Sequence, residues 1–472
     1  MTKIYVYNTL TQKKEEFVPK KEGEISIYVC GVTPYSETHL GHARPSVIWD
    51  VIKRFFRSRG YTTVHVQNFT DVDDKIIQRA QEQGLEALDI SRRYTAEYLA
   101  DMDALGVERA DHYPKVSEHI PEIIGFVEKL VEKEHAYRGN GDVFFHVASF
   151  PGYGKLSKQR LSELREGTRF EIDPAKREAV DFALWKQAKA GEPAWESPWG
   201  QGRPGWHIEC SAMAYKYLGT EFDFHGGGSD LIFPHHENEI AQSEAATGKP
   251  LARFWVHNGM LNLKDTKMSK SLGNVISVNQ MVKRYPKELL RFYLLSTHYR
   301  SGLEYYEGKI EEVKRGWSRL NAAVRALKAD LQQAGTGPEG VLERKASKEI
   351  DGLGDDLLAA FSDDFNTARA IGVLFELVRA VNTYKADGGN NRAVFARALQ
   401  LFELYGAEIM GVVEPEETDT GGLTPALLDL VLRLREELRQ SKNFALADQI
   451  RDELAELGVV IEDTAQGPRW KV

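Results

Sequence analysis

The stretch Tyr28–His42, with the sequence YVCGVTPYSETHLGH, constrains the fold more than any other part of the chain. Every second residue from Ile25 to Val29 is aliphatic, a period of two that predicts a β-strand ending at Cys30. Apolar residues then recur at helical spacing from Val47 to Phe56. The letters HLGH therefore fall where a strand gives way to a helix, and the unpaired N–H groups of a helix N-terminus favour phosphate. Histidines that only cap the helix or face solvent would give the same pattern.

Strand-like and helix-like segments continue to alternate as far as about Leu105, with a second strand at Thr62–Phe69. This alternation predicts a parallel sheet with crossover helices, in which ligands gather beyond the carboxyl ends of the strands. Cys30 and Thr70 both fall at such ends. The acidic stretch Thr70–Lys75, TDVDDK, fits a metal site or, as is commoner, a set of caps for a helix that begins near Lys75.

A second cysteine and a group of histidines follow far along the chain. Cys210 lies in the sequence GWHIECS, which we place beside another strand end, and Phe222–Ala245 reads FDFHGGGSDLIFPHHENEIAQSEA. A helix beyond Pro234 would put Glu239 within reach of both His235 and His236, which precede it by four and three residues. Two cysteines, one histidine and one glutamate fit a tetrahedral zinc site. Free cysteines are also commonly small buried apolar residues, and charged helix faces are commonly solvated.

A lysine-bearing motif, KMSKS, occupies Lys267–Ser271. Two lysines separated by small residues suit a clamp on a triphosphate, although a solvated charged loop would look alike. Its occurrence after HLGH resembles the HIGH and KMSKS signatures of class I aminoacyl-tRNA synthetases. Five blocks sharpen this resemblance to the cysteinyl-tRNA synthetase family, in this order: CGVTPYSETHLGHARP, NFTDVDDKI, GWHIECSAM, HGGGSDLIFPHHENEIAQSEA and KMSKSLGN.

The resemblance implies a zinc ion, one per chain, held by Cys30, Cys210, His235 and Glu239. Zinc binds thiolates far better than hydroxyls, so an open position on the metal would separate cysteine from serine. The resemblance also implies ATP, with Mg²⁺, at His39, Gly41, His42, Lys267 and Lys270. We expect Trp206, Thr70 and Asp230 to contact the substrate cysteine. The implied anticodon-contacting residues are Arg439, Phe444, Asp448, Arg451 and Asp463.

These features predict an α/β Rossmann-like catalytic domain with an inserted connective peptide, followed by an α-helical bundle and a small C-terminal anticodon-binding module. The predicted ranges are 1–115 and 204–250 for the catalytic domain, 116–203 for the insertion, 251–305 for a KMSKS-bearing stem-contact region, 306–411 for the bundle, 412–424 for a linker and 425–472 for the module.

Composition limits the cellular setting and the partners. Two cysteines cannot form a disulfide framework, and the N-terminus lacks a signal-peptide core, so we expect a cytoplasmic protein without a membrane span. The net charge of −9 excludes a uniformly basic nucleic-acid coat but allows one basic face. The expected partners are tRNA(Cys), L-cysteine and ATP, acting on a monomer. Two rival hypotheses are a cysteine ligase of mycothiol biosynthesis, which lacks the last module, and a non-catalytic zinc RNA-binding protein.

Overall fold

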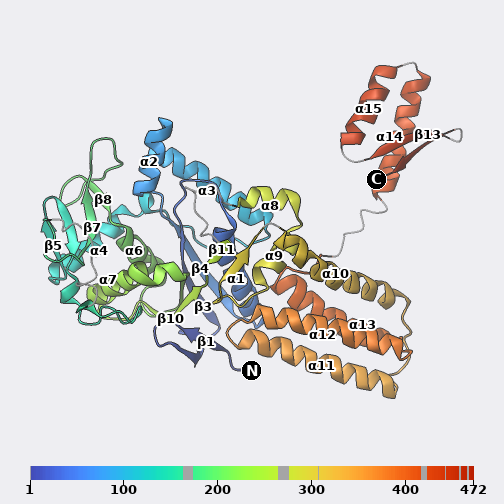
Figure 1. Cartoon of the computed structure of the whole chain (residues 1–472), viewed down its shortest axis with the longest axis horizontal. Coiled ribbons are helices and arrows are strands. Elements are labelled where there is room, and N and C mark those ends of the chain that lie inside the picture. The colour runs from blue at the N-terminus through green and yellow to red at the C-terminus, as the bar shows by residue number, and fades with distance from the viewer. Residues whose placement is uncertain are drawn as a thin grey trace. The chain divides into compact units, whose positions relative to one another are not determined.

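The computed structural model describes residues 2–162, 174–263, 276–306, 308–415, 423–441, 443–456, 459–464 and 467–471. They form two compact units, Met1–Val413 and Glu414–Val472. In the first unit, a parallel sheet lies between a mixed insertion and a group of long helices (Figure 1).

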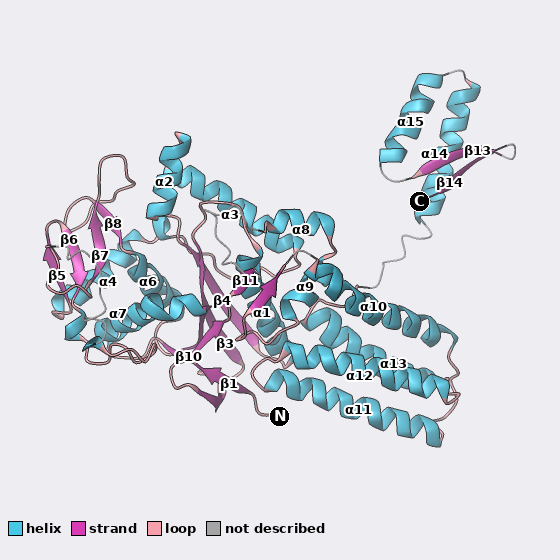
Figure 2. Cartoon of the chain, in the orientation of Figure 1, coloured by secondary structure: helices cyan, strands magenta, loops and turns pink. Residues whose placement is uncertain are grey.

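Four parallel strands form the central sheet in the order β10-β9-β3-β4. They are β3 (Glu24–Val32), β4 (Thr62–Phe69), β9 (Phe222–Gly228) and β10 (Ala252–Asn258). Figure 2 shows this sheet in magenta, with helices around it. Helix α1 (Leu40–Ser58) connects β3 to β4, which confirms the predicted crossover. The catalytic range was predicted to stop at residue 250, but the sheet continues to Asn258 because β10 pairs with β9.

The two faces of β3 contribute to different hydrophobic cores. Ile25, Ile27 and Val29 join the core that also contains α1, whereas Tyr28 joins a second core and Cys30 packs against that core. Successive side chains of a strand point to opposite faces. The alternation read from the sequence therefore aims Cys30 at the second core, which includes helices α6 (Trp206–Leu218) and α7 (Glu237–Thr247).

The insertion has its own antiparallel sheet, in the order β5-β6-β7-β8. Its strands are β5 (Ala136–Gly139), β6 (Asp142–Phe145), β7 (Phe182–Gln187) and β8 (Gly202–Pro204), preceded by α4 (Ile120–Glu132). One loop of the insertion is fastened to α7: the backbone N–H groups of Gly154 and Ser157 donate to the Glu237 carboxylate at 3.0 and 2.7 Å. Glu237 lies two residues before Glu239, so this contact fixes the start of α7.

Other short elements surround the sheet. The N-terminal hairpin is β1 (Tyr5–Asn8) with β2 (Lys13–Glu16), and β11 (Leu261–Leu263) pairs with β12 (Leu303–Tyr305). Other helices before the bundle, among the described residues, are α2 (Asp74–Gln83), α3 (Ala87–Ala104), α8 (Val278–Arg284) and α9 (Lys287–Leu295). The Asp73 side chain accepts from the Lys75 N–H and caps α2, which confirms the capping interpretation of TDVDDK.

The rest of the first unit is a bundle of long helices. It contains α10 (Lys309–Gln333), α11 (Val341–Ser362), α12 (Thr367–Ala386), α13 (Arg392–Leu401) and a π-helical segment, Phe402–Ile409. Leu320, Val324 and Leu327 of α10 are buried, as their helical spacing predicted.

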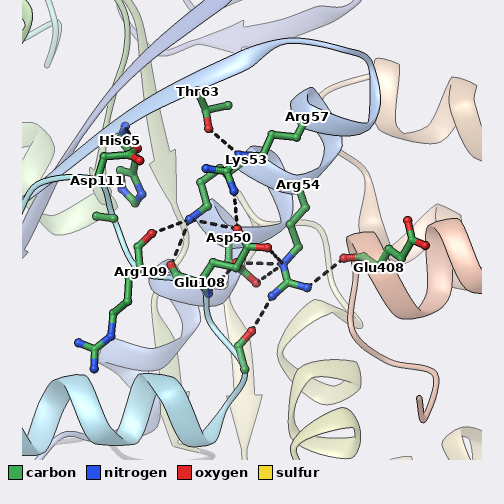
Figure 3. Close-up of polar contacts among 12 residues, drawn as sticks. Asp50, Lys53, Arg54, Arg57, Thr63, His65, Glu108, Arg109, Asp111 and Glu408 are labelled. Carbon is green, nitrogen blue, oxygen red and sulfur yellow. Dashed lines mark hydrogen bonds and ion pairs between the residues drawn. The ribbon is translucent and has the colours of Figure 1, made fainter. Parts of the chain in front are cut away.

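A network of buried charges joins this bundle to helix α1 (Figure 3). Asp50 accepts from Arg54 Nε at 3.0 Å and from Arg291 Nη2 at 2.7 Å. Arg54 also donates to the Glu408 carbonyl at 3.0 Å, and Arg291 donates to the Met410 carbonyl at 2.7 Å. The helix whose first turn carries HLGH is therefore tied to the last segment of the bundle.

The second unit consists of α14 (Leu423–Gln440), α15 (Phe444–Glu456) and the hairpin β13 (Val460–Thr464) and β14 (Gly467–Lys471). Helix α14 begins inside the predicted linker 412–424. Among the residues that the structure describes, no helix is both long and apolar enough to cross a membrane.

Candidate active site and metal centre

Four potential metal ligands meet beneath the carboxyl end of β3. Cys30 comes from β3, Cys210 from α6, His235 from the π-helical turn Ile232–His236, and Glu239 from the first turn of α7. One donor atom from each lies within 4.8 Å of the others. Cys210 was expected at a strand end; instead Gly205 caps a helix after β8, and Cys210 lies in the second turn of α6.

The distances fit a small tetrahedral cation. The Cys30 and Cys210 sulfurs are 3.6 Å apart, and tetrahedral Zn–S bonds of about 2.3 Å would separate two sulfurs by about 3.8 Å. Glu239 Oε1 lies 3.3 Å from Cys30 Sγ and 3.0 Å from His235 Nε2. A set of two sulfurs, an imidazole and a carboxylate is one that zinc prefers.

A second group of donors shares two of these residues. His225 and His236 also lie within 4.8 Å of Cys30 and Glu239, all measured between donor atoms. His225 Nε2 is 2.8 Å from Glu239 Oε2, and His236 Nδ1 is 2.8 Å from His257 Nε2. Cys30, Cys210 and His235 line the neighbouring cavity, whereas His225 and His236 do not. A ligand in the cavity can therefore reach the first group.

The pKa values of the buried groups in this region are strongly shifted by burial and by their neighbours. The hydrogen bond with Cys30 lowers the pKa of Cys210 to about 6 in spite of burial, whereas burial raises the pKa of Cys30 well above its ordinary value. Burial disfavours the Glu239 carboxylate, but His225 and His235 outweigh it and hold its pKa well below the ordinary value. Burial lowers the pKa of His235, but Glu239 and Cys210 outweigh burial and raise it to about 10, so a protonated His235 balances the negative charge that the site gathers away from water.

The cavity beside these donors has a volume of about 470 Å³. It brings together every predicted nucleotide- and cysteine-binding residue that the structure describes: His39, Gly41, His42, Thr70, Trp206 and Asp230. The Trp206 ring is 41% exposed and stacks on His235 with ring centroids 4.3 Å apart. Thr70 Oγ1 donates to Glu209 Oε2 at 3.0 Å.

The HLGH segment also lines the cavity, through His39, Gly41 and His42. His39 is the N-cap residue of α1, and its ring stacks on that of His42 with centroids 3.7 Å apart. Leu40 N donates to the Ile276 carbonyl at 3.1 Å, and Val278 N donates to the Thr38 carbonyl at 3.0 Å. Lys267 and Lys270 lie outside the described residues, but the chain that follows them is held against HLGH.

Family models match three parts of this chain. Residues 16–315 match the tRNA synthetases class I (C) catalytic domain, residues 358–414 match the DALR domain, and residues 421–470 match the cysteinyl-tRNA ligase anticodon binding domain. The curated cysteine–tRNA ligase of Pelotomaculum thermopropionicum is 50% identical over 99% of both chains. The chain belongs to the cysteine–tRNA ligase family. The ligase of Desulforudis audaxviator is 49% identical over 99% of this chain and 100% of its own length.

Solved structures agree with this family at the level of the fold. The Mycobacterium tuberculosis methionyl-tRNA synthetase with methionyl-adenylate has a TM-score of 0.62 at 15% identity, covering 82% of this chain and 89% of that one. A putative arginyl-tRNA synthetase from Campylobacter jejuni has a TM-score of 0.59 at 15% identity, covering 85% and 95%. The predicted Rossmann-like fold with a following helical region is therefore confirmed as that of a class I synthetase.

The second unit carries the residues that the family resemblance assigned to the anticodon. Arg439 lies on α14, and Phe444 begins α15 with 55% of its surface exposed. Asp448 and Arg451 lie one turn apart on α15 and form an ion pair of 3.1 Å. Asp463 is in β13, and its side chain is outside the described part of the structure.

The sequence reasoning missed several polar residues behind the donors. His225 holds Glu239, and His207 Nδ1 lies 3.0 Å from His235 Nδ1. Gln242 Nε2 donates to the His207 carbonyl and to Ser211 Oγ, both at 2.9 Å. A signal was present, because His207 is in the block GWHIECS and His225 opens HGGGSD. Burial lowers the pKa of His207 well below its ordinary value, with a smaller contribution from His235.

Proposed function

We propose that this chain attaches L-cysteine to tRNA(Cys) in two ATP-dependent steps, and that Cys30, Cys210, His235 and Glu239 hold a zinc ion that recognises the substrate. The observation that carries this proposal is that two cysteines, a histidine and a glutamate lie together beside a cavity that the N-terminus of α1 also lines. A metal centre and an anion-binding helix end thus share one space of about 470 Å³.

Bound zinc would supply a Lewis acid that favours a thiolate over a hydroxyl. Pocket shape alone separates near-isosteres by only about 10–200-fold, so the distinction between cysteine and serine depends on this donor set. Cys30, Cys210 and His235 present their side chains to the cavity, and Glu239 closes the set from behind.

The substrate would be oriented by residues beside the donors. We assign its amino group to Thr70, whose hydroxyl is held by Glu209, and to Asp230. Trp206 would cover the substrate from the cavity side, because its exposed ring lies flat on His235. These contacts would direct the carboxylate toward α1.

In the first step a carboxylate oxygen of cysteine attacks the α-phosphorus of ATP, and pyrophosphate leaves. His39 and His42, at the N-terminus of α1, would hold phosphate oxygens, and Gly41 would lie under the adenine. Lys270, with Lys267, would stabilise the departing pyrophosphate, and Mg²⁺ would accompany ATP. Such chemistry depends on positioning and on charge stabilisation more than on covalent help from the protein.

In the second step the terminal ribose of the tRNA takes the cysteinyl group. The match of residues 421–470 to an anticodon-binding domain favours tRNA over an amino-sugar acceptor. Arg439, Phe444, Asp448, Arg451 and Asp463 are the proposed anticodon contacts, since unstacked loop bases are read by aromatic and polar side chains. We further propose a monomer in the cytoplasm, where Cys30 and Cys210 stay reduced. The segment 251–305 would contact the tRNA stem, and 116–203 would be the connective-peptide insertion.

Cysteine-dependent ATP–pyrophosphate exchange and zinc analysis test this function together. The wild-type chain should carry one zinc ion, and its preference for cysteine over serine should exceed the ~10–200-fold that shape provides. Cys30→Ser and Cys210→Ser should lose stoichiometric zinc. Met213→Leu, which is buried on the same helix as Cys210, is the matched control and should keep it. Stoichiometric zinc in both serine variants would remove the metal from the proposal.

A further inference from the structure

Two imidazole rings touch behind the proposed metal centre. His207 lies in the first turn of α6 and His235 in the π-helical turn before α7, and their Nδ1 atoms are 3.0 Å apart. A hydrogen bond between two ring nitrogens needs one of them to donate and the other to accept. The contact therefore links the proton positions of the two rings.

The other nitrogen of His235 decides the direction of this bond. His235 Nε2 is the atom that faces the donor set, 3.0 Å from Glu239 Oε1. A neutral imidazole that binds a metal through Nε2 carries its single proton on Nδ1. That proton points at His207 Nδ1, which must then be the acceptor, and His207 carries its own proton on Nε2.

The surroundings hold the His207 ring in this position. Phe182 contacts it edge to face, with ring centroids 5.3 Å apart and planes at 82°. The His207 carbonyl accepts from Gln242 Nε2 at 2.9 Å, which ties the first turn of α6 to α7. His207 also lines a second cavity of about 250 Å³, together with Asp73 and Glu209. The ring is thus fixed by aromatic packing on one side and by its backbone on the other.

We propose that His207 is a positioning residue: by accepting the Nδ1–H of His235 it fixes the tautomer and orientation that leave His235 Nε2 available to the metal. This inference rests on the proposed zinc site and extends it to a residue that does not touch the metal. It parallels Glu239, whose second oxygen is held by His225 Nε2 at 2.8 Å. The acceptor here is uncharged, which adds no negative charge to a site that already contains two cysteines and a carboxylate.

Two substitutions separate hydrogen bonding from packing. His207→Phe keeps a ring against Phe182 but removes the acceptor, whereas His207→Asn places an amide oxygen near the position of Nδ1. His119→Phe is the control: His119 is buried, bonds to Tyr217 on the same helix α6 at 3.1 Å, and is not one of the donors. The measurement is the zinc dissociation constant of each full-length variant, from competition with a chromophoric chelator, alongside the melting temperature of the metal-free protein.

His207→Phe should weaken zinc binding by about 10–100-fold, the usual effect of losing a hydrogen-bond partner of a metal-binding histidine. His207→Asn should restore affinity to within about threefold of wild type, and His119→Phe should leave it unchanged even if its melting temperature falls. Wild-type affinity in His207→Phe, or equal losses in the Phe and Asn variants, would overturn the assignment while leaving the zinc site in place. A wild-type chain that binds no zinc would instead refute the proposed metal centre.

Discussion

Replacing Asp50 by Asn should destabilise the first unit more than any exposed substitution, although Asp50 touches no proposed substrate. The Asp50 carboxylate is buried and accepts three hydrogen bonds, from Arg54 Nε, Arg291 Nη2 and the Glu108 N–H, at 2.7–3.0 Å. Arg291 is 2% exposed, so its charge has no access to water once the carboxylate is neutralised. Figure 3 shows Asp50 beside Arg54 and Glu108.

The size of this loss of stability depends on the hydrogen bonds that Arg291 and Arg54 keep after Asp50 is replaced. Removing one member of a buried ion pair costs about 3–5 kcal/mol because the other charge stays buried and uncompensated. Arg291 keeps its hydrogen bond to the Met410 carbonyl, and Arg54 keeps those to Gly106 and Glu408. We therefore expect Asp50→Asn to lower the free energy of unfolding by about 3 kcal/mol, the low end of that range.

Urea unfolding of the full chain, followed by tryptophan fluorescence, measures this loss; Trp49 is buried next to Asp50 in the sequence. Arg291→Met and the double variant complete a double-mutant cycle, in which Asp50→Asn should cost at least ~1.5 kcal/mol less once Arg291 is absent. Arg57→Gln breaks the half-exposed pair with Glu108 and should cost no more than ~1 kcal/mol. Additive single losses, or an Asp50→Asn loss below ~1 kcal/mol, would refute the uncompensated-charge argument.

Two further predictions concern the buried carboxyl group of Asp101 and the KMSKS motif. Burial, with a smaller contribution from Glu97, raises the pKa of Asp101 from 3.8 to about 6. The folded chain therefore binds this proton more tightly than the unfolded chain does, and the protein loses stability as the pH rises through this window. Asp101→Asn should therefore raise the melting temperature at pH 7.5, with a gain that shrinks toward pH 4; a constant difference across that range would contradict the assignment. Lys270→Ala should lower cysteine-dependent ATP–pyrophosphate exchange by about a hundredfold or more, the scale of losing one charge-stabilising donor, and an unchanged exchange rate would exclude the role.

Local patterns in the sequence predicted the elements that carry the site. The alternation from Ile25 to Val29 predicted β3, and the spacing from Val47 to Phe56 predicted α1, because both elements bury one regular face. Asp73 was expected to cap a helix and does so. These predictions succeeded since each depends on neighbours within a few residues.

Local patterns could not predict contacts between segments that are far apart in the sequence. Spacing could not choose between His235 and His236, and in the structure His235 Nε2 is 3.0 Å from Glu239 Oε1, whereas His236 Nε2 is 3.9 Å away. The contact between His207 and His235 joins α6 to a turn 28 residues later. It depends on tertiary packing, which the periodicity of the sequence does not show. Cys210 was placed beside a strand end but lies in α6; Ile208 and Ala212, both buried and four residues apart, carry the helical spacing that was overlooked.

The separation of the proposed zinc ligands along the chain would decide when a metal ion could be bound during synthesis. Cys30 and Glu239 are 209 residues apart, and the whole insertion lies between them. About the first half of the protein must therefore leave the ribosome before Glu239 can approach Cys30. Until then the proposed site lacks its fourth ligand, so Cys30 stays an uncoordinated thiol while the insertion is synthesised and folds.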